Sequence, residues 1–382
     1  MSDGPLEPSG IAQLVEHNYC QRYLKQRIEP GDEVGARDWQ EAYGLMSIAL
    51  LGKGQEFEAD QIESLAADAT HIIAPALDDR TKTGVPDIPI NETWADSPSG
   101  RTTQLTTAIN HAATLDTPNE AIPYILLYQV PLDGTLGEEP VYGDVDCIAL
   151  APADAVPTPQ RHDNTTPAVV ARVIDLKSAQ DEQPAHRVQV AAYCELLVQT
   201  LAEGPCEIDC RIEASVLTES HATADGETQS PFDLPTFQRA GWELSVTSLL
   251  SNHGPVAEAL TNDLEDLPFT LDQVCNNCAY REACATRAVE NPRGTQSLAM
   301  LGVGASTQRR LQEAGLTSLH DIATLGPPRR ETKPMDTPSQ LDLNADLQRR
   351  LEETLPWPIH ELVLRAQALY GEIEPKYPGY DT

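Results

Sequence analysis

The sequence has few basic residues and no long apolar run. Its 382 residues include 26 lysines and arginines against 59 aspartates and glutamates, which gives a formal net charge of −33. Such a charge repels a polyanion over most of the surface, and taken alone it argues against nucleic acid as a partner. No run of about 20 apolar residues occurs, so we expect neither a membrane-spanning helix nor a membrane partner. The N-terminal segment MSDGPLEPSG has neither the basic nor the apolar part of a secretory leader, so we expect a cytoplasmic protein.

The acidic residues are spread along the whole chain. Together with few lysines and many aspartates, threonines and alanines, this composition resembles the bias of halophilic archaeal proteins. At 1 M salt the Debye length falls to roughly 3 Å, so bulk charge is screened and local basic groups decide what binds. The net charge therefore excludes no class of partner.

The order of the expected elements predicts an α/β protein. Helices are expected where apolar residues recur at helical spacing, at 11–28, 39–73 (as two helices, interrupted at 51–54), 102–115 and 186–201. Strands are expected where β-branched and aromatic residues cluster, at 122–131, 141–150, 168–177 and 206–218. Polar loops are expected at 78–101 and 151–167. This order predicts a mixed β-sheet flanked by helices.

Two neighbouring predicted strands carry charged side chains. One contains Gly143-Asp144-Val145-Asp146 and the next contains Asp175-Leu176-Lys177. Residues i and i+2 of a strand share a face, so Asp175 and Lys177 point the same way. Antiparallel pairing of the strands brings Asp146 beside Asp175, which gives an oxygen site suited to Mg²⁺ or Mn²⁺. Such an ion polarises a phosphoryl oxygen and activates water, and the lysine orients that water or neutralises charge, so the pattern predicts phosphodiester hydrolysis.

An isolated Asp-x-Lys is more often a solvated strand end, but here a helix with Gln189 and Tyr193 on one face follows it. The series G-x-x-D, D-x-K and Q-x-x-x-Y resembles the RecB-like branch of the PD-(D/E)xK nuclease superfamily. The resemblance implies a restriction-endonuclease-like sheet and an Mg²⁺- or Mn²⁺-dependent deoxyribonuclease. It implies that Asp146 and Asp175 are metal ligands and that Lys177, Gln189 and Tyr193 are catalytic residues.

The resemblance also implies a further metal ligand on an upstream helix, a few residues after a glycine. Gly54-Gln55-Glu56-Phe57-Glu58 occupies that place, and the role is carried over to Glu58. Many relatives have histidine there, and Glu56 and Glu63 are close in the sequence. As a plain helix carboxylate, Glu58 could equally be a surface residue. Asp144 shares the face of Asp146, and it is either the second ligand or a neighbour of it.

Four of the eight cysteines form a ligand-like set. Cys275-x2-Cys278-x5-Cys284 is compact, and Cys20 best supplies a fourth thiolate. Four cysteine sulfurs suit either Zn²⁺ or an iron-sulfur cluster, and the spacing alone does not choose. The alternative is a set of unrelated buried cysteines. The remaining four cysteines lie in apolar patterns, which fits a reducing compartment.

One distant N-terminal cysteine with a C-terminal trio around a nuclease core resembles the RecB-like nucleases that contain a [4Fe-4S] cluster. These include AddB-type helicase-nucleases and the CRISPR-associated iron-sulfur exonucleases. The resemblance implies that Cys20, Cys275, Cys278 and Cys284 hold such a cluster. A link from Cys20 to Cys275 would fix the N-terminal helix against the end of the nuclease domain.

A small all-α appendage is expected after the nuclease domain. The turn Leu301-Gly302-Val303-Gly304 between apolar segments, followed by Thr307-Gln308-Arg309-Arg310, resembles a helix-hairpin-helix, whose glycines let backbone N–H groups approach a phosphate. A packing hairpin without a ligand is the alternative. The expected domains are therefore the nuclease at 1–292, the hairpin at 293–326, and a linker with a helical tail at 327–382.

These observations predict a DNA nuclease, acting on single strands or ends in repair or recombination, with helicase or repair proteins as expected partners. Two alternatives stay open. One is a CRISPR-adaptation nuclease, and the other is a non-catalytic DNA-binding or scaffolding protein with a vestigial site.

Overall fold

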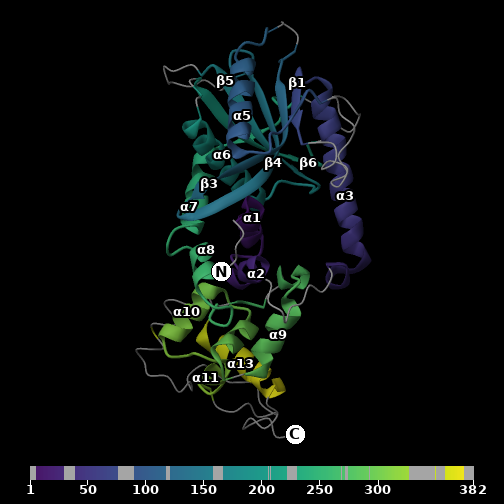
Figure 1. The fold of residues 1–382 in the computed structure, drawn as a ribbon. Helices are drawn as coiled ribbons and strands as arrows, with labels where there is room; N and C mark the ends of the chain where they lie inside the picture. Colours follow the sequence, from purple (N-terminus) through teal and green to yellow (C-terminus); the bar gives the residue numbers. More distant parts are fainter. Residues whose placement is uncertain are drawn as a thin grey trace. The chain divides into compact units, whose positions relative to one another are not determined.

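The chain forms two compact units. In the computed structural model, unit 1 comprises Met1–Glu16 and Gly44–Glu258, and unit 2 comprises His17–Tyr43 and Ala259–Thr382 (Figure 1). The structure describes residues 6–29, 39–75, 90–117, 121–157, 167–204, 206, 208–221, 230–267, 269–271, 274–291, 293–326, 349 and 358–373. The domain limits expected from the sequence, 1–292, 293–326 and 327–382, stay a prediction.

Unit 1 contains a seven-stranded mixed sheet in the order β2-β1-β3-β4-β5-β6-β7. The strands are β1 (His71–Ala74), β2 (Glu92–Thr93), β3 (Ile125–Leu136), β4 (Glu139–Pro152), β5 (Val169–Lys177), β6 (Cys210–Thr218) and β7 (Thr236–Phe237). The pairs β3–β4, β4–β5 and β6–β7 are antiparallel, while β1–β2, β1–β3 and β5–β6 are parallel. The predicted α/β class with a mixed sheet is confirmed.

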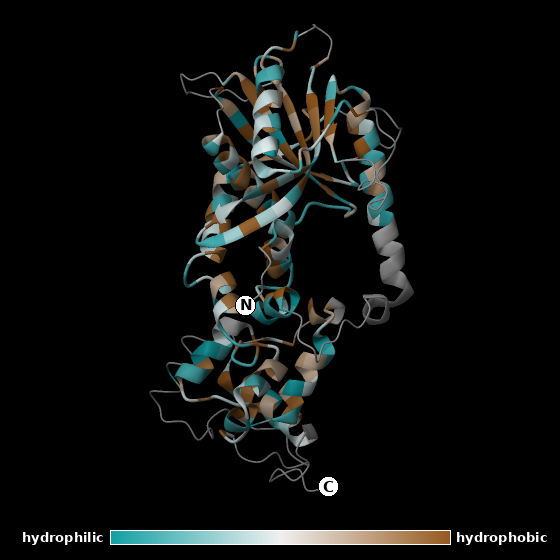
Figure 2. Cartoon of the chain, viewed as in Figure 1, coloured by the Kyte–Doolittle hydropathy of each residue, from teal (hydrophilic) through white to brown (hydrophobic). Residues whose placement is uncertain are grey.

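The central strands are apolar because both of their faces are covered. In β5, VVARVIDLK, every residue but the last is buried, as expected of a strand between two helical layers. Figure 2 shows brown, hydrophobic residues concentrated on the strands of this sheet. β3 and β4 form a long hairpin that turns at Gly137, where φ is +65°, a value that favours glycine.

Helices cover both faces of the sheet. Ile62 and Leu65 of α3 (Trp39–Ala67) pack on one face with Tyr128, Cys147 and other strand residues. α6 (Pro184–Glu203) packs on the other face, where it also contacts α5 (Pro98–Ala112), α1 (Pro8–Glu16) and α7 (Arg239–Leu249). The α3 layer and the α6 layer therefore enclose the sheet.

Several predicted boundaries were wrong. The helix expected at 11–28 is two helices, α1 and α2 (Gln21–Ile28), separated by a turn in which Asn18 and Tyr19 have positive φ. The two helices expected within 39–73 are one 29-residue helix, α3, followed by strand β1. A glycine within a helix costs only about 1 kcal/mol relative to alanine, so Gly52 and Gly54 do not end α3. The loop expected up to 101 ends earlier, because Ser97 caps α5 at Pro98.

Unit 2 is helical in the part of it that the structure describes. Besides α2, its elements are α8 (Pro255–Thr261, shared with the end of unit 1), η2 (Val274–Asn277), α9 (Arg281–Glu290), η3 (Thr295–Leu301), α10 (Ala305–Glu313), α11 (Leu319–Ala323) and α13 (Ile359–Ile373). Leu298, Leu311, Ile322 and Val363 belong to its core. In the linker and tail expected at 327–382, residues 327–348 and 350–357 lie outside the described residues. No helix in the described part of the chain is long and apolar enough to cross a membrane.

Candidate active site

Asp175 is the most buried charged residue of the candidate site. It lies near the end of β5 and is 0% exposed. The Nε2 atom of Gln189 donates a hydrogen bond of 3.1 Å to Asp175 Oδ1, and Lys177 Nζ lies 3.1 Å from the same oxygen. Ile174 and Leu176 point to the α3 layer, so Asp175 points to the α6 layer, where Gln189 meets it. The strand alternation and the helix after it therefore bring these three residues together.

The second oxygen of Asp175 has no hydrogen-bond partner. Asp175 Oδ2 is buried and accepts no hydrogen bond in the structure. Burial raises the pKa of Asp175 to about 8, Lys177 opposes this rise, and the charge of Asp146 adds to it. A buried carboxylate oxygen without a donor is unfavourable unless a proton or a cation compensates it. This oxygen therefore has the environment of a metal ligand.

Asp146 is on β4, the strand next to β5, which carries Asp175. Its Oδ2 atom accepts a hydrogen bond of 2.7 Å from the backbone N–H of Leu176. This bond fixes the side chain beside the Asp-x-Lys segment, because β4 and β5 are paired antiparallel and their register reaches Cys147 and Ile174. The predicted neighbourhood of Asp146 and Asp175 is therefore present.

The β3–β4 hairpin changes faces at Asp146. On the side of Asp146 away from the hairpin turn, Tyr128 and Cys147 form a cross-strand pair, and both face the α3 layer. Nearer the turn, Gly134 and Gly143 lie an even number of residues from Tyr128 and Cys147, so in a regular hairpin they would face the same side. They face α6 instead, as shown by the Cβ positions on them, which would meet Leu196 and Tyr193 respectively. Gln129 has φ +45°, in the left-handed region that non-glycine residues rarely adopt. The register of β3 and β4 leaves Gln129 opposite Asp146.

This change of face explains how ligands from both layers meet. Glu58 is on α3, whereas Asp175 points to α6, and Asp146 lies where the hairpin passes from one layer to the other. The hydroxyl of Tyr128 donates a hydrogen bond of 3.0 Å to Glu58 Oε1. Burial raises the pKa of Glu58 and the charge of Asp146 raises it further, while Tyr128 and Lys177 oppose the rise. Glu58 is therefore within the electrostatic reach of the site.

The neighbouring carboxylates are placed differently. Glu56 and Glu63 are exposed on α3, so Glu58 is the one of these three glutamates that faces the site. Asp144 is exposed and accepts a hydrogen bond of 3.1 Å from Tyr142. Burial of its carboxyl raises the pKa of Asp144, while Tyr142 and Arg101 oppose the rise. Asp144 lies at the edge of the site and Asp146 lies within it.

Tyr193 lies beside the carboxylates, and Gly143 makes room for it. Burial raises the pKa of Tyr193, and the charges of Asp146 and Asp175 raise it further. A Cβ atom on Gly143 would lie 3.1 Å from Tyr193 Cε1 and 2.8 Å from Pro8 Cδ. The glycine of the G-x-x-D motif therefore lets the tyrosine of the Q-x-x-x-Y motif pack directly on β4.

Lys177 completes the charge balance. Burial lowers its pKa, but Asp175, Asp146 and Glu58 together outweigh this and hold the pKa above its usual value. The lysine is therefore a cation. One lysine facing three carboxylates leaves the site acidic, which suits a divalent cation. Among the described residues, however, no three carboxylate, imidazole or thiol side chains lie at the spacing of ligands on a single ion.

The four cysteines of the ligand-like set all belong to unit 2. Cys20 is the N-cap residue of α2, Cys275 lies in η2 with Cys278 just after it, and Cys284 lies in α9. Burial raises the pKa of the Cys20 thiol to about 12, and the other three thiols add to this rise. Burial also raises the pKa of Cys284 to about 11. The Cys20 and Cys284 thiols are therefore protonated at neutral pH, and all four cysteines are close enough for Cys275 and Cys278 to affect the titration of these two.

A buried arginine lies beside these thiols. Arg22 is 1% exposed, donates from Nη1 to the Leu264 carbonyl oxygen at 2.8 Å, and lies over the Phe269 ring at 4.7 Å. Its Nε and Nη2 atoms are buried without a hydrogen-bond partner. The Arg22 charge lowers the pKa of Cys284, although burial outweighs it. A side-chain hydrogen bond from Arg22 to Cys284 adds to this lowering, and a buried cation fits thiolates better than thiols.

The expected hairpin has a structural glutamine at its centre. Gly302 has φ +63° and ends η3, which is a 3₁₀-helix, and Gly304 precedes α10. Gln308 is 2% exposed and donates to the carbonyl oxygens of Phe269 and Val303. Gln308 therefore holds the turn, while Arg309 and Arg310 are exposed.

Sequence reasoning missed Tyr128 and Gln129. Tyr128 lies within the apolar run ILLYQV, where an aromatic residue predicts only a strand. Nothing in the sequence indicates the positive φ of Gln129. A polar residue between two apolar strand segments was the one available signal.

The comparison with known families matches the region around these motifs. Residues 163–285 match the model of the PD-(D/E)XK nuclease superfamily. No curated protein matches the chain. The matched stretch includes Asp175, Lys177, Gln189 and Tyr193, and it ends one residue after Cys284, while Glu58 and Asp146 precede it. Residues 163–285 thus carry similarity to the PD-(D/E)XK nuclease superfamily, within the mixed α/β sheet expected of such a nuclease.

Proposed function

We propose that the chain is a divalent-metal-dependent deoxyribonuclease that cuts single strands or DNA ends in repair or recombination. The observation that carries the proposal is the environment of Asp175. Its carboxylate is fully buried, one oxygen has no donor, and the other is held by Gln189 and Lys177. A purely structural carboxylate would have both oxygens satisfied.

Each residue of the site has a role in this proposal. Asp146, Asp175 and Glu58 would hold the cation, since all three are oxygen donors whose charges affect one another. When bound, Mg²⁺ or Mn²⁺ supplies positive charge to the phosphoryl oxygen and lowers the pKa of water. Lys177 orients the attacking water or neutralises developing charge. Gln189 fixes Asp175 Oδ1, and Tyr193 packs beside both aspartates.

We also propose that Cys20, Cys275, Cys278 and Cys284 hold a [4Fe-4S] cluster. The proximity of the four thiols and the buried Arg22 support this assignment. Zinc bound by the same thiols is the competing assignment.

Cleavage assays on anaerobically purified full-length protein test the nuclease. Labelled single- and double-stranded DNA, and RNA of the same sequence, are incubated with Mg²⁺, Mn²⁺ or a chelator. We expect DNA cleavage that needs the divalent ion. Asp175→Ala and Lys177→Ala should each lose at least about 100-fold in rate, while Asp181→Ala, an exposed aspartate nearby, should keep the wild-type rate.

Two outcomes contradict the nuclease. The first is a failure to cut any DNA with either metal. The second is DNA binding that is unchanged by Lys177→Ala and by removal of divalent ions, which supports the non-catalytic module instead. Cleavage by the wild-type protein, with a similar loss of rate in Asp175→Ala and in Lys177→Ala, supports the proposal.

A further inference from the structure

His186 lies on the helix face that meets the carboxylates of the candidate active site. It precedes Gln189 by three residues and Tyr193 by seven on α6, and residues at this spacing share one face of a helix. On this face Gln189 donates to Asp175, and Tyr193 lies beside the same carboxylate. His186 is therefore the first member of a stripe of residues that faces the site.

The direction of α6 places His186 at the same end of the site as Lys177. β5 and β6 are parallel neighbours, and α6 connects them, so the helix runs antiparallel to β5. Lys177 is two residues beyond Asp175, about 7 Å further along the strand. His186 is three residues before Gln189, about 4.5 Å back along the helix. Because the helix runs in the opposite direction, both steps lead the same way from the contact between Asp175 and Gln189.

The cap of α6 fixes which nitrogen of His186 carries the proton. The backbone N–H of Gln183 donates a hydrogen bond of 3.2 Å to His186 Nδ1. A backbone amide can only donate, so Nδ1 is the acceptor and the proton of the neutral ring is on Nε2. Burial lowers the pKa of His186 to about 4, and the charge of Lys177 lowers it further, while Glu182 opposes this. The ring is therefore neutral at neutral pH.

The Nε2–H group of His186 is a free donor. Among the described residues, none accepts a hydrogen bond from it, and the atom is open to solvent. Side-chain N–H groups commonly bind phosphate oxygens of nucleic acids. A neutral donor also adds no positive charge near the carboxylates, so it does not oppose a divalent cation there.

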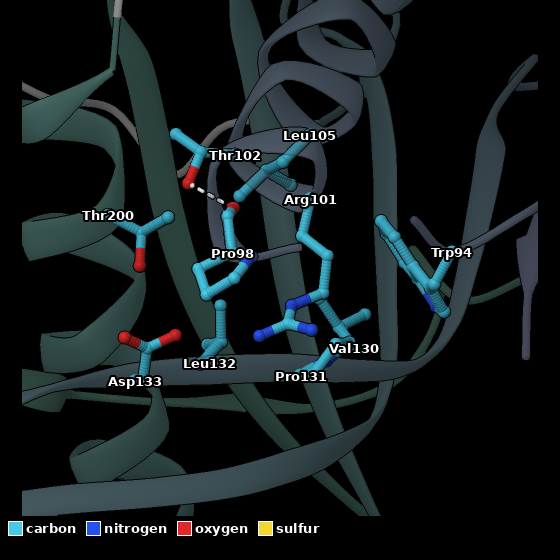
Figure 3. Close-up of a pocket in the computed structure, with 10 residues that line it drawn as sticks. All are labelled: Trp94, Pro98, Arg101, Thr102, Leu105, Val130, Pro131, Leu132, Asp133 and Thr200. Atoms are coloured by element: carbon cyan, nitrogen blue, oxygen red, sulfur yellow. Dashed lines mark hydrogen bonds between the residues drawn. The ribbon is translucent and has the colours of Figure 1, made fainter. Parts of the chain in front are cut away.

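Arg101 on α5 does not serve the same purpose, although its charge reaches Asp144. Figure 3 shows its guanidinium beside Pro131 and Leu132 of β3. The hollow that these residues line has room for about one water molecule, and Arg101 Nη1 donates to the Asp96 carbonyl oxygen at 3.0 Å. A nucleotide does not fit this hollow, so Arg101 is not assigned to the substrate.

We propose that the Nε2–H group of His186 donates a hydrogen bond to a phosphate oxygen of the substrate strand next to Lys177. This assignment rests on the proposed nuclease function and names a substrate contact within the same site. His186 is then a substrate-binding residue. It has no part in metal binding, because Nδ1 is used by Gln183 and Nε2 carries the proton.

Two variants separate the donor from the helix cap. In His186→Asn the amide oxygen can take the place of Nδ1 and accept from Gln183, but the side chain is too short to reach the position of Nε2. In His186→Gln the amide group reaches that position, and the acceptor beside Gln183 is lost. His111→Asn, which changes an exposed histidine of α5, is the matched control.

Binding of a fluorescent single-stranded oligonucleotide is measured at several salt concentrations, in proteins that all carry Asp175→Asn so that the strand stays intact. His186→Asn should weaken binding about tenfold and leave the melting temperature unchanged. The slope of log Kd against log salt should also stay unchanged, because a neutral donor releases no counterion, whereas loss of a cationic contact would lower it by about 0.7. His111→Asn should change none of these quantities.

The glutamine variant should behave in the opposite way. His186→Gln should keep most of the affinity and lower the melting temperature by about 2 to 4 °C, the effect of a lost cap. A histidine that only caps α6 would give wild-type affinity in His186→Asn and weaker binding in His186→Gln. That result would overturn the proposal.

NMR of protein labelled with ¹⁵N at histidine checks the proton directly. The signals of His186 are assigned by their absence in His186→Asn. At pH 7 they should be those of a neutral ring with the proton on Nε2, and the oligonucleotide should shift the Nε2 signal. A proton on Nδ1, or an Nε2 signal that does not respond to the bound strand, would contradict the proposal.

The outcomes separate this proposal from the nuclease function. A wild-type protein that cuts DNA, together with unchanged affinity in His186→Asn, overturns the His186 contact alone. A wild-type protein that neither cuts nor binds DNA overturns both. Weaker binding at an unchanged salt slope and melting temperature in His186→Asn, and not in His111→Asn, supports the contact.

Discussion

The carboxylates of unit 1 and the thiols of unit 2 are both buried clusters of like groups, but their partners differ. The carboxylates have donors in place, from Leu176, Gln189, Tyr128 and Lys177. The thiols have one buried cation, Arg22, which bonds to Cys284. The first cluster is therefore compensated in large part without a metal, apart from Asp175 Oδ2, and the second is compensated only as neutral thiols or by a bound metal. Unit 1 should tolerate exchange of its ion, whereas unit 2 should depend on its cluster for stability.

The largest expected difference concerns removal of a thiol. Cys278→Ser should lose bound iron and sulfide and lower the melting temperature of unit 2 by about 10 °C or more, because metal binding to a buried thiolate set contributes several kcal/mol to folding. Cys206→Ser, on a cysteine of unit 1, should change neither. Calorimetry and metal analysis on anaerobic samples measure this. Equal melting temperatures and equal iron contents in the two variants would contradict the contrast.

The next largest effect should be the dependence of the melting temperature of unit 1 on pH. Burial raises the pKa of Asp175 from 3.8 to about 8, so the folded state binds this proton more tightly than the unfolded state. The stabilising effect is complete below pH 4 and is lost as the pH rises to about 8. Metal-free protein should therefore melt several degrees lower at pH 8.5 than at pH 5, on the order of 5 °C for the unit. Mn²⁺ at pH 8.5 should restore the loss.

A variant checks the source of that pH effect. Asp175→Asn has no carboxyl to titrate at this position, so its melting temperature should change less between pH 5 and pH 8.5 and should not respond to Mn²⁺. If the melting temperature of Asp175→Asn changes as much between pH 5 and pH 8.5 as that of the wild type, groups other than Asp175 cause the pH dependence.

A smaller effect is expected where Gly143 meets Tyr193. The added Cβ atom of Gly143→Ala would lie 2.8 Å from Pro8 and 3.1 Å from Tyr193, so Tyr193 has to move. We expect about a tenfold loss of cleavage, as for a group displaced by a fraction of an ångström, with Mn²⁺ affinity unchanged. Gly134→Ala, whose Cβ would meet Gln199 away from the carboxylates, is the control. Equal effects on cleavage in the two variants would mean that the loss reflects the hairpin and not the tyrosine.

The smallest effect should come from the backbone at Gln129. Because its φ is +45°, Gln129→Gly should leave stability unchanged or raise it slightly, and Gln129→Val should lower it by about 1 to 3 kcal/mol. Urea unfolding curves measure both. A valine variant as stable as the glycine variant would show that β3 does not need the left-handed conformation opposite Asp146.

The sequence predicted the mixed sheet and the neighbours of Asp175 because both follow from local patterns. Strand alternation places Asp175 and Lys177 on one face, and helical spacing places Gln189 where it can reach them. The compact spacing of Cys275, Cys278 and Cys284 predicted a shared ligand set, and the resemblance to iron-sulfur nucleases added the distant Cys20.

What the sequence could not show depends on tertiary geometry. The face change of the β3–β4 hairpin coincides with the positive φ of Gln129, a conformation that glutamine rarely adopts and that its presence in the sequence does not indicate. Glu58 and Asp175 come from opposite layers of the sheet, and Asp146 lies where the hairpin passes from one layer to the other.

Mn²⁺ binding and iron content, measured together on one variant, test the contrast between the two clusters most directly. Anaerobic Asp175→Asn protein is washed with a chelator, titrated with Mn²⁺ by calorimetry, and analysed for iron and sulfide. The account predicts that Mn²⁺ binding is lost while iron and sulfide stay at the wild-type level. Wild-type Mn²⁺ binding in this variant, or a colourless protein with zinc in place of iron, would contradict it.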